Sequence, residues 1–101
     1  MFNPLDPILH SQIRLAIVAI LAGVENADFI YLKEQIKVSA GNLSLQLGKL
    51  QEAGYISLEK GFKGKYPKTT CTLTETGRSA YVKYVDALKT YLQPATPLPH
   101  P

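Results

Sequence analysis

The central part of the chain opens with an apolar pattern that predicts a helix. Leu43, Leu47 and Leu50 recur at i, i+4 and i+7, which places their side chains on one helical face. Ser39 can cap the start of this helix, and Gly54 suits the left-handed backbone position just after its end. The pattern therefore indicates a capped helix that buries one leucine face.

A change of period after this helix predicts a two-stranded hairpin. In residues 55–60, and again in residues 69–73, apolar side chains alternate with polar ones, as in strands that bury one face. Gly61 and Gly64 lie between the two strands and are expected to form the turn. Four lysines with no acidic residue among them surround these glycines: Lys60, Lys63, Lys65 and Lys68. The hairpin is therefore expected to carry a basic loop.

Three further helices are predicted around this unit. The first runs from about Ile8 to Ala22 and is apolar nearly all round, so both of its sides are expected to be buried. Asp28 is expected to cap a short second helix, and Thr74 a last helix that continues to about Leu92. The predicted fold class is mainly α with a small β-hairpin and a long C-terminal helix.

Two apolar surfaces predict pairing with a second copy of the chain. The first helix has an apolar second side, and the last helix repeats aromatic and leucine side chains at spacings of three and four. Such a seam suits packing against another long helix. The candidate dimer contacts are Leu15, Val18, Tyr81, Tyr84, Leu88 and Tyr91. The alternative is that these side chains pack within one chain.

Length and charge distribution refine this picture. The chain has 101 residues, which predicts one domain over residues 1–92 and a flexible proline-rich tail over residues 93–101. The net charge is +3, but residues 1–59 carry four basic and six acidic side chains, whereas residues 60–101 carry seven basic and two acidic. The positive end is therefore the hairpin together with the C-terminal residues after it, as binding to a polyanion requires.

The cysteine count and hydropathy favour a cytoplasmic protein. A single cysteine cannot form an internal disulfide, which fits a reducing compartment. The apolar run from Leu15 to Ala22 is too short to cross a bilayer. We therefore expect no membrane partner.

An ordered string of four motifs resembles the winged helix-turn-helix transcriptional regulators, a broad class that includes MarR-like and ArsR-like repressors. The motifs are GNLS at residues 41–44, KLQEAGY at 49–55, KGFKGKYPKT at 60–69 and LTETGR at 73–78. The resemblance covers residues 8–92 and is strongest to a small single-domain subgroup. It implies a homodimeric regulator of transcription that binds double-stranded DNA, with a recognition helix in the major groove and a basic wing on the backbone or in the minor groove.

Two sets of side chains are candidates for DNA contact. The amides of Asn42 and Gln46 suit adenine, Lys49 can reach guanine or a phosphate, and Leu45 can touch a thymine methyl group. The expected helix contacts are Ser39, Asn42, Ser44, Leu45, Gln46 and Lys49, and the expected wing contacts are Lys60, Lys63, Lys65, Tyr66 and Lys68. Leu45, Gln46 and Gly48 depart from the family, which commonly carries arginine or histidine on this face. Phe62 is expected to fasten the hairpin rather than to insert between bases.

The sequence leaves other functions open. Because Leu45 is neutral, the chain can instead be a winged-helix protein-interaction module without specific DNA binding. A cleft between the first and last helices could also admit a small apolar effector, whose identity is unknown. No cluster of cysteine, histidine and carboxylate side chains has metal-ligand spacing, and no nucleophile motif is present. We therefore expect no enzyme, no cofactor and no metal site, with Cys71 an inert core residue.

Overall fold

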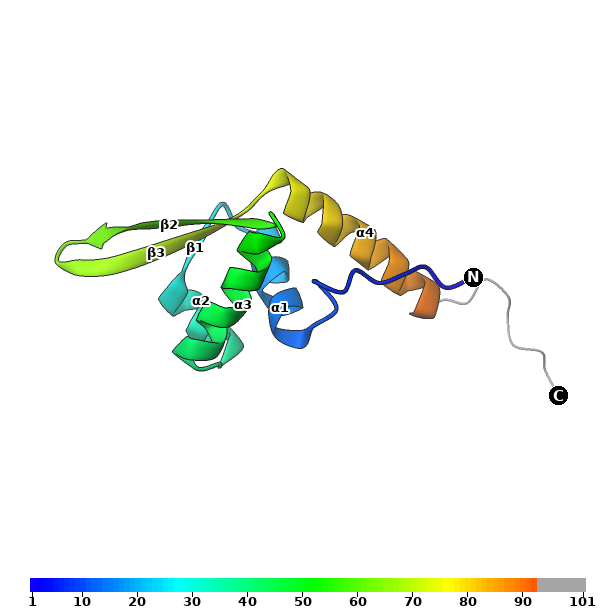
Figure 1. The fold of residues 1–101 in the computed structure, drawn as a ribbon, viewed down its shortest axis with the longest axis horizontal. Helices are drawn as coiled ribbons and strands as arrows, with labels where there is room; N and C mark the ends of the chain where they lie inside the picture. Colours follow the sequence, from blue (N-terminus) through cyan, green and yellow to red (C-terminus); the bar gives the residue numbers. More distant parts are fainter. Residues whose placement is uncertain (93–101) are drawn as a thin grey trace.

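The computed structural model describes residues 1–92 and forms a winged helix (Figure 1). The predicted tail, residues 93–101, lies outside the described residues. In chain order the elements are α1 (Gln12–Ala22), β1 (Ala27–Asp28), α2 (Phe29–Ile36), α3 (Ala40–Glu52), β2 (Ile56–Lys63), β3 (Tyr66–Leu73) and α4 (Glu75–Leu92). The predicted mainly α architecture with a long last helix is confirmed.

The helix starts are set by capping side chains. Ser39 Oγ accepts the backbone N–H of Asn42 at 3.1 Å, and Asp28 Oδ1 accepts that of Tyr31 at 2.7 Å. Thr74 Oγ1 accepts the backbone N–H of Gly77 at 3.0 Å. All three predicted caps are therefore confirmed. The predicted start of the first helix at Ile8 is wrong. The N–H groups of Leu9 and His10 bond back to the Asp6 carbonyl in a turn, and α1 begins only after Ser11, its N-cap residue.

The end of α3 also agrees with the prediction. Gly54 has a φ of 79°, and its N–H donates to the Gln51 carbonyl at 2.9 Å while that of Tyr55 donates to the Leu50 carbonyl at 3.0 Å. This pair of bonds is a Schellman motif, which requires a left-handed residue that glycine adopts without steric cost. It turns the chain directly from α3 into β2.

The sheet differs from the predicted two-stranded hairpin in two respects. It has a third strand, because the two-residue β1 pairs antiparallel with β3 and gives the order β1-β3-β2. A strand this short carries no alternation that a sequence pattern can reveal. The turn consists of Gly64 and Lys65 alone, since Lys63 pairs with Tyr66, whereas Gly61 lies within β2 opposite Lys68. The hairpin is therefore longer than predicted.

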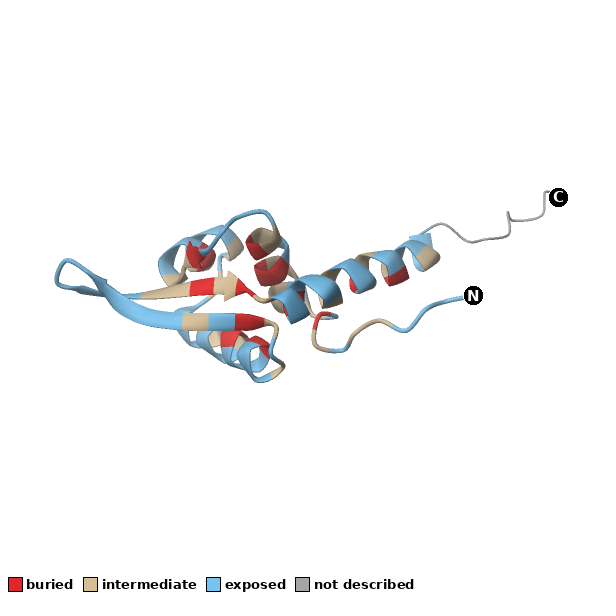
Figure 2. Cartoon of the chain, turned by 90° about the horizontal axis from the view of Figure 1, so that it is seen from above, coloured by how far each residue is buried: buried red, intermediate tan, exposed pale blue. Residues whose placement is uncertain are grey.

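One hydrophobic core joins the helices to the inner part of the sheet (Figure 2). Leu43, Leu47 and Leu50 are buried, as their spacing predicted, and Cys71 is buried opposite Leu58 of β2. By contrast, residues 59–68 are exposed on both strands. We call residues 56–73 the wing and residues 59–68 the outer wing. The outer wing extends beyond the helical body, as Figures 1 and 2 show.

The N-terminal segment runs beside α4 (Figure 1). The Asn3 N–H donates to Thr90 Oγ1 at 3.2 Å, the Tyr91 hydroxyl donates to the Asn3 carbonyl at 2.8 Å, and the Phe2 and Tyr91 rings stack with centroids 5.0 Å apart. These contacts hold the two ends of the described chain together. None of the helices in residues 1–92 has both the length and the apolar character needed to cross a membrane.

Candidate nucleic-acid interface

The side of α3 that faces away from its buried leucines is open to solvent. The residues of α3 that lie opposite the buried leucines are Gly41, Leu45 and Gly48, and the neighbouring Ser44 and Lys49 are exposed as well. Leu45 is 56% exposed, and a Cβ on either glycine would meet no atom within 4 Å. The exposed Leu45 side chain therefore lies between two glycines, Gly41 and Gly48, that carry no side chain on this face. Ser39, the N-cap residue of α3 and another of the six predicted helix contacts, is exposed too.

The other two predicted groove residues, Asn42 and Gln46, lie at the edge of this face and are half-buried. Arg14 Nη1 donates to Gln46 Oε1 at 2.7 Å, and Gln46 Nε2 donates to Asn42 Oδ1 at 3.0 Å. In this structure the Gln46 amide and the Asn42 carbonyl are therefore engaged within the protein, and their contact with adenine stays a prediction. A base can reach them in the predicted manner only if the bonds within the protein are released.

Arg14 is a residue that the sequence patterns did not single out. Its Nε donates to the Ile8 carbonyl at 2.6 Å and its Nη2 to the Pro7 carbonyl at 3.4 Å, so its guanidinium connects the N-terminal segment, α1 and α3. The one available signal was a lone charged side chain within an otherwise apolar helix. Such a residue is expected to have a specific partner.

Replacement of Arg14 by methionine tests this connection. Methionine keeps the apolar stem, but it leaves the part-buried Ile8 carbonyl and the Gln46 amide without their donor. We expect the free energy of unfolding, measured by urea denaturation, to fall by about 2 kcal/mol. Arg78→Met is the matched control, since Arg78 is exposed and makes one bond, of 3.3 Å, to the Ala22 carbonyl. Equal losses in the two variants would contradict a special role for Arg14.

The lysines predicted to contact DNA are exposed on the outer wing. Its four lysines and Tyr66 are exposed, and Tyr66 is 78% exposed. Paired residues of an antiparallel ladder project to the same side, so Lys63, Tyr66 and Lys68 share one side of the hairpin, while Lys60 lies on the other. Within residues 1–92 none of these lysines forms an ion pair. Both sides of the hairpin therefore carry lysine, and the side of Lys63 and Lys68 also carries the acid Glu59.

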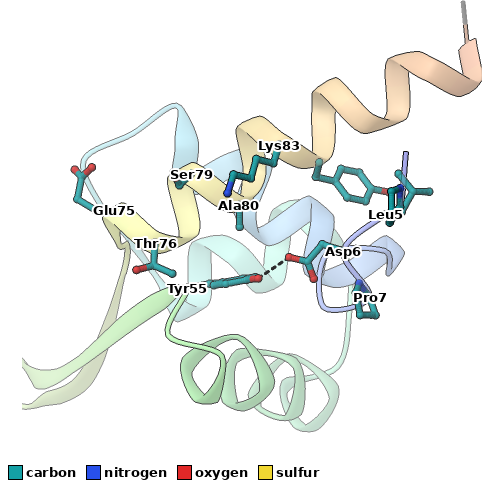
Figure 3. Close-up of a pocket in the computed structure, with 11 residues that line it drawn as sticks. Leu5, Asp6, Pro7, Tyr55, Glu75, Thr76, Ser79, Ala80 and Lys83 are labelled. Carbon is teal, nitrogen blue, oxygen red and sulfur yellow. Dashed lines mark hydrogen bonds between the residues drawn. The ribbon is translucent and has the colours of Figure 1, made fainter. Parts of the chain in front are cut away.

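A hollow of about 810 Å³ lies between the N-terminal segment and the start of α4 (Figure 3). This hollow is partly polar, because carboxylates, hydroxyls and an amine contribute to it. It is not the effector cleft expected between the first and last helices of a dimer, which stays a prediction. The lining of the hollow includes Leu5, Asp6, Tyr55, Glu75, Ser79 and Lys83.

Tyr55 closes one side of this hollow through its hydroxyl, which donates to Asp6 Oδ2 at 2.5 Å (Figure 3). The bond to the carboxylate raises the pKa of Tyr55 to about 12, and partial burial and the negative charge of Asp6 act in the same direction. A phenol bonded in this way loses its interaction when it ionises. The bond ties the segment before α1 to the chain between α3 and β2.

The raised pKa of Tyr55 predicts a pH dependence of stability. A group whose pKa is higher in the folded state stabilises the protein fully below its unfolded value, near pH 10, and this stabilisation is lost as the pH rises through about 12. Urea denaturation of the wild-type protein and of Tyr55→Phe measures this contribution. We expect the variant to be less stable at pH 8, and the difference to shrink between about pH 10 and 12. A difference that stays constant over this range would contradict the Asp6 bond.

The six residues predicted for dimer contact divide by burial. Val18 and Tyr84 are 0% and 4% exposed within the single chain, so both are core residues. In this structure their side chains cannot reach a second copy of the chain. Tyr84 also bonds His10 Nδ1 through its hydroxyl, at 3.0 Å. Leu15, Tyr81 and Leu88 are half-buried, and Tyr91 is 42% exposed.

Cys71 is fully buried, in agreement with its predicted place in the core. Burial raises the pKa of its thiol to about 11, and the nearby charge of Asp28 adds to the effect. The reactive thiolate is therefore disfavoured near neutral pH.

The chain belongs to the family of winged helix DNA-binding domains, whose sequence model matches residues 13–92. It is 39% identical over 79 residues to the uncharacterized protein MJ0432 of Methanocaldococcus jannaschii, a match that covers 77% of this chain and 85% of that protein.

Solved structures of transcriptional regulators share the fold. The transcriptional regulator homologue from Pyrococcus horikoshii superposes with a TM-score of 0.79 at 24% identity, over 84% of either chain. Bacillus subtilis PadR, solved in complex with operator DNA, superposes with a TM-score of 0.64 at 18% identity, over 90% of this chain and 53% of that one. The family is therefore that of winged helix DNA-binding domains, and the fold is one that solved transcriptional regulators share.

Proposed function

We propose that this protein regulates transcription by binding duplex DNA as a homodimer, with α3 in the major groove and the wing on the backbone or in the minor groove. The observation that carries the proposal is the outer wing, where Lys60, Lys63, Lys65 and Lys68 are exposed and unpaired within the described residues. The outer wing also contains one acid, Glu59, at its inner end, so its formal charge is +3. Four cations against one acid on a protruding hairpin match the phosphates of a duplex.

The exposed face of α3 complements the wing. Ser44 and Lys49 can bond phosphates or base edges, and Leu45 can contact a thymine methyl group. Because the Asn42 and Gln46 amides are engaged within the protein, base recognition by this face depends first on Leu45 and its two neighbours. Bacillus subtilis PadR, which shares this fold, was solved in complex with operator DNA, and this supports DNA as the partner.

The dimer would use the part of α4 that the single chain leaves open. Val82, Tyr91 and Leu92 are 54%, 42% and 70% exposed, and Phe2 beside Tyr91 is 54% exposed. Tyr91, Leu92 and Phe2 lie at the end of α4, and Val82 lies nearer its middle. Exposed apolar side chains along a protruding helix favour association with a second copy. Multi-angle light scattering of the purified protein measures this association directly.

A protein-interaction module is the second candidate function, because Leu45 is an exposed apolar side chain on a neutral part of α3. Fluorescence anisotropy with a labelled random duplex, titrated with salt, separates the two functions. DNA binding predicts that log affinity falls linearly with log salt, with a slope of roughly −4 per subunit if four lysines contact phosphates. Absence of binding even at low salt would reject the proposal in favour of a protein partner.

A further inference from the structure

Phe62 is an exposed aromatic side chain on the outer wing. It is 75% exposed and faces only Pro67 across the hairpin. Pairing with Pro67 leaves most of the Phe62 ring uncovered. Residues 59–68 are exposed throughout, so the uncovered part of the ring is open to solvent and to a partner.

The position of Phe62 along the hairpin defines what the ring can reach. The turn consists of Gly64 and Lys65, the pair Lys63–Tyr66 comes directly behind it, and Phe62 with Pro67 forms the next pair. A strand rises about 3.4 Å per residue, so Phe62 lies roughly 7 Å behind the tip. The minor groove of B-DNA is about 7.5 Å deep. A tip that reaches the floor of the groove therefore holds Phe62 at its rim.

The rim of the groove is formed by the sugars of the two strands, and their carbon faces are apolar. Lys60 projects to the same side of the hairpin as Phe62, and Lys63 to the opposite side. Either amine can therefore reach a phosphate while the ring lies on a sugar. The surrounding positive charge favours a polyanion as the partner of this ring over an apolar protein surface.

We propose that Phe62 packs against deoxyribose at the rim of the minor groove, and that this contact lets the wing prefer duplex DNA over duplex RNA. The inference rests on the proposed function. Lysines bind the phosphates of either duplex. In A-form RNA the minor groove is wide and shallow and displays 2′-hydroxyl groups, so it offers the ring no comparable apolar wall.

Anisotropy titrations with DNA and RNA duplexes of the same sequence test this contact. We expect Phe62→Ala to bind DNA about tenfold more weakly than wild type, since a ring half covered by sugar loses most of that contact. The salt slope is expected to stay unchanged because no charge is removed, and RNA affinity to stay within about twofold. Phe62→Leu, which keeps an apolar side chain, is expected to restore part of the DNA affinity.

Val24→Ala is the control for loss of an exposed apolar side chain, because Val24 is 42% exposed in the loop after α1. It should leave both affinities unchanged. Unaltered DNA affinity in Phe62→Ala would overturn the inference, and so would equal losses on DNA and RNA, which would indicate a damaged hairpin. Failure of the wild-type protein to bind any duplex would reject the proposed function itself.

Discussion

Replacement of Lys60, Lys63 and Lys65 by alanine is expected to weaken binding to duplex DNA by roughly 10²- to 10³-fold at about 0.1 M salt. All three side chains are exposed, and within residues 1–92 they form no ion pair, so their charges are available to phosphates. Each phosphate contact releases condensed counterions and contributes about 0.9 to the slope of log affinity against log salt. The slope of the variant should therefore be shallower by roughly 2.7.

The matched control removes three lysines elsewhere. Lys33, Lys83 and Lys89 lie on α2 and α4, and their replacement by alanine gives the same net charge. We expect this control variant to lose far less affinity and to keep a slope close to that of the wild type, because phosphates are contacted locally. Equal losses in the two triple variants would mean that the net charge, and not the wing, drives binding.

Replacement of Gly77 by alanine is expected to lower the free energy of unfolding by about 3 kcal/mol. Gly77 is buried in the first turn of α4. A Cβ there would overlap the backbone carbonyl of Tyr55 and lie 2.7 Å from Leu73 Cδ1. Because the overlap is with backbone, a side-chain rotation cannot relieve it, and α4 must move from the sheet. Thermal unfolding should show a midpoint lowered by roughly 15 °C.

Gly48→Ala is expected to have the opposite effect on the free energy of unfolding. Gly48 is exposed within α3, and a Cβ at this position would meet no atom within 4 Å. Alanine should therefore stabilise the helix by about 1 kcal/mol, through the usual difference in helix propensity. If both glycine variants were destabilised to the same extent, the close contact between α4 and Tyr55 would not be the cause.

Local patterns predicted most of the fold because the interactions behind them are local. Leucine spacing on α3, the caps at Ser39 and Asp28 and the left-handed Gly54 each depend on residues within a few positions of one another. Such signals are readable from the chain alone. Hydrophobic alternation located both long strands for the same reason, although the ladder of β2 and β3 continues through Gly61 and beyond the apolar positions.

The late start of α1 has a local cause, the Asp6 turn and the Ser11 cap. Contacts between distant parts of the chain, by contrast, were not predicted at all. The Gln46 amide is bonded to Arg14, 32 positions away, and the Asp6 carboxylate is bonded to Tyr55, 49 positions away. Nothing in the local sequence of either partner encodes these pairs, since they form only when α1 and the N-terminal segment pack against the rest of the protein.

The sequence by itself determined the class of the protein, through the order of its helices and strands and the four lysines of the wing, because periodicity and charge are properties of neighbouring residues. Only the tertiary structure decided which polar side chains are available to a partner. Packing of α1 against α3 bonds Arg14 to Gln46, and the Gln46 amide in turn bonds Asn42 within α3. The outer wing lies beyond the hydrophobic core, so its lysines, Tyr66 and Phe62 stay exposed.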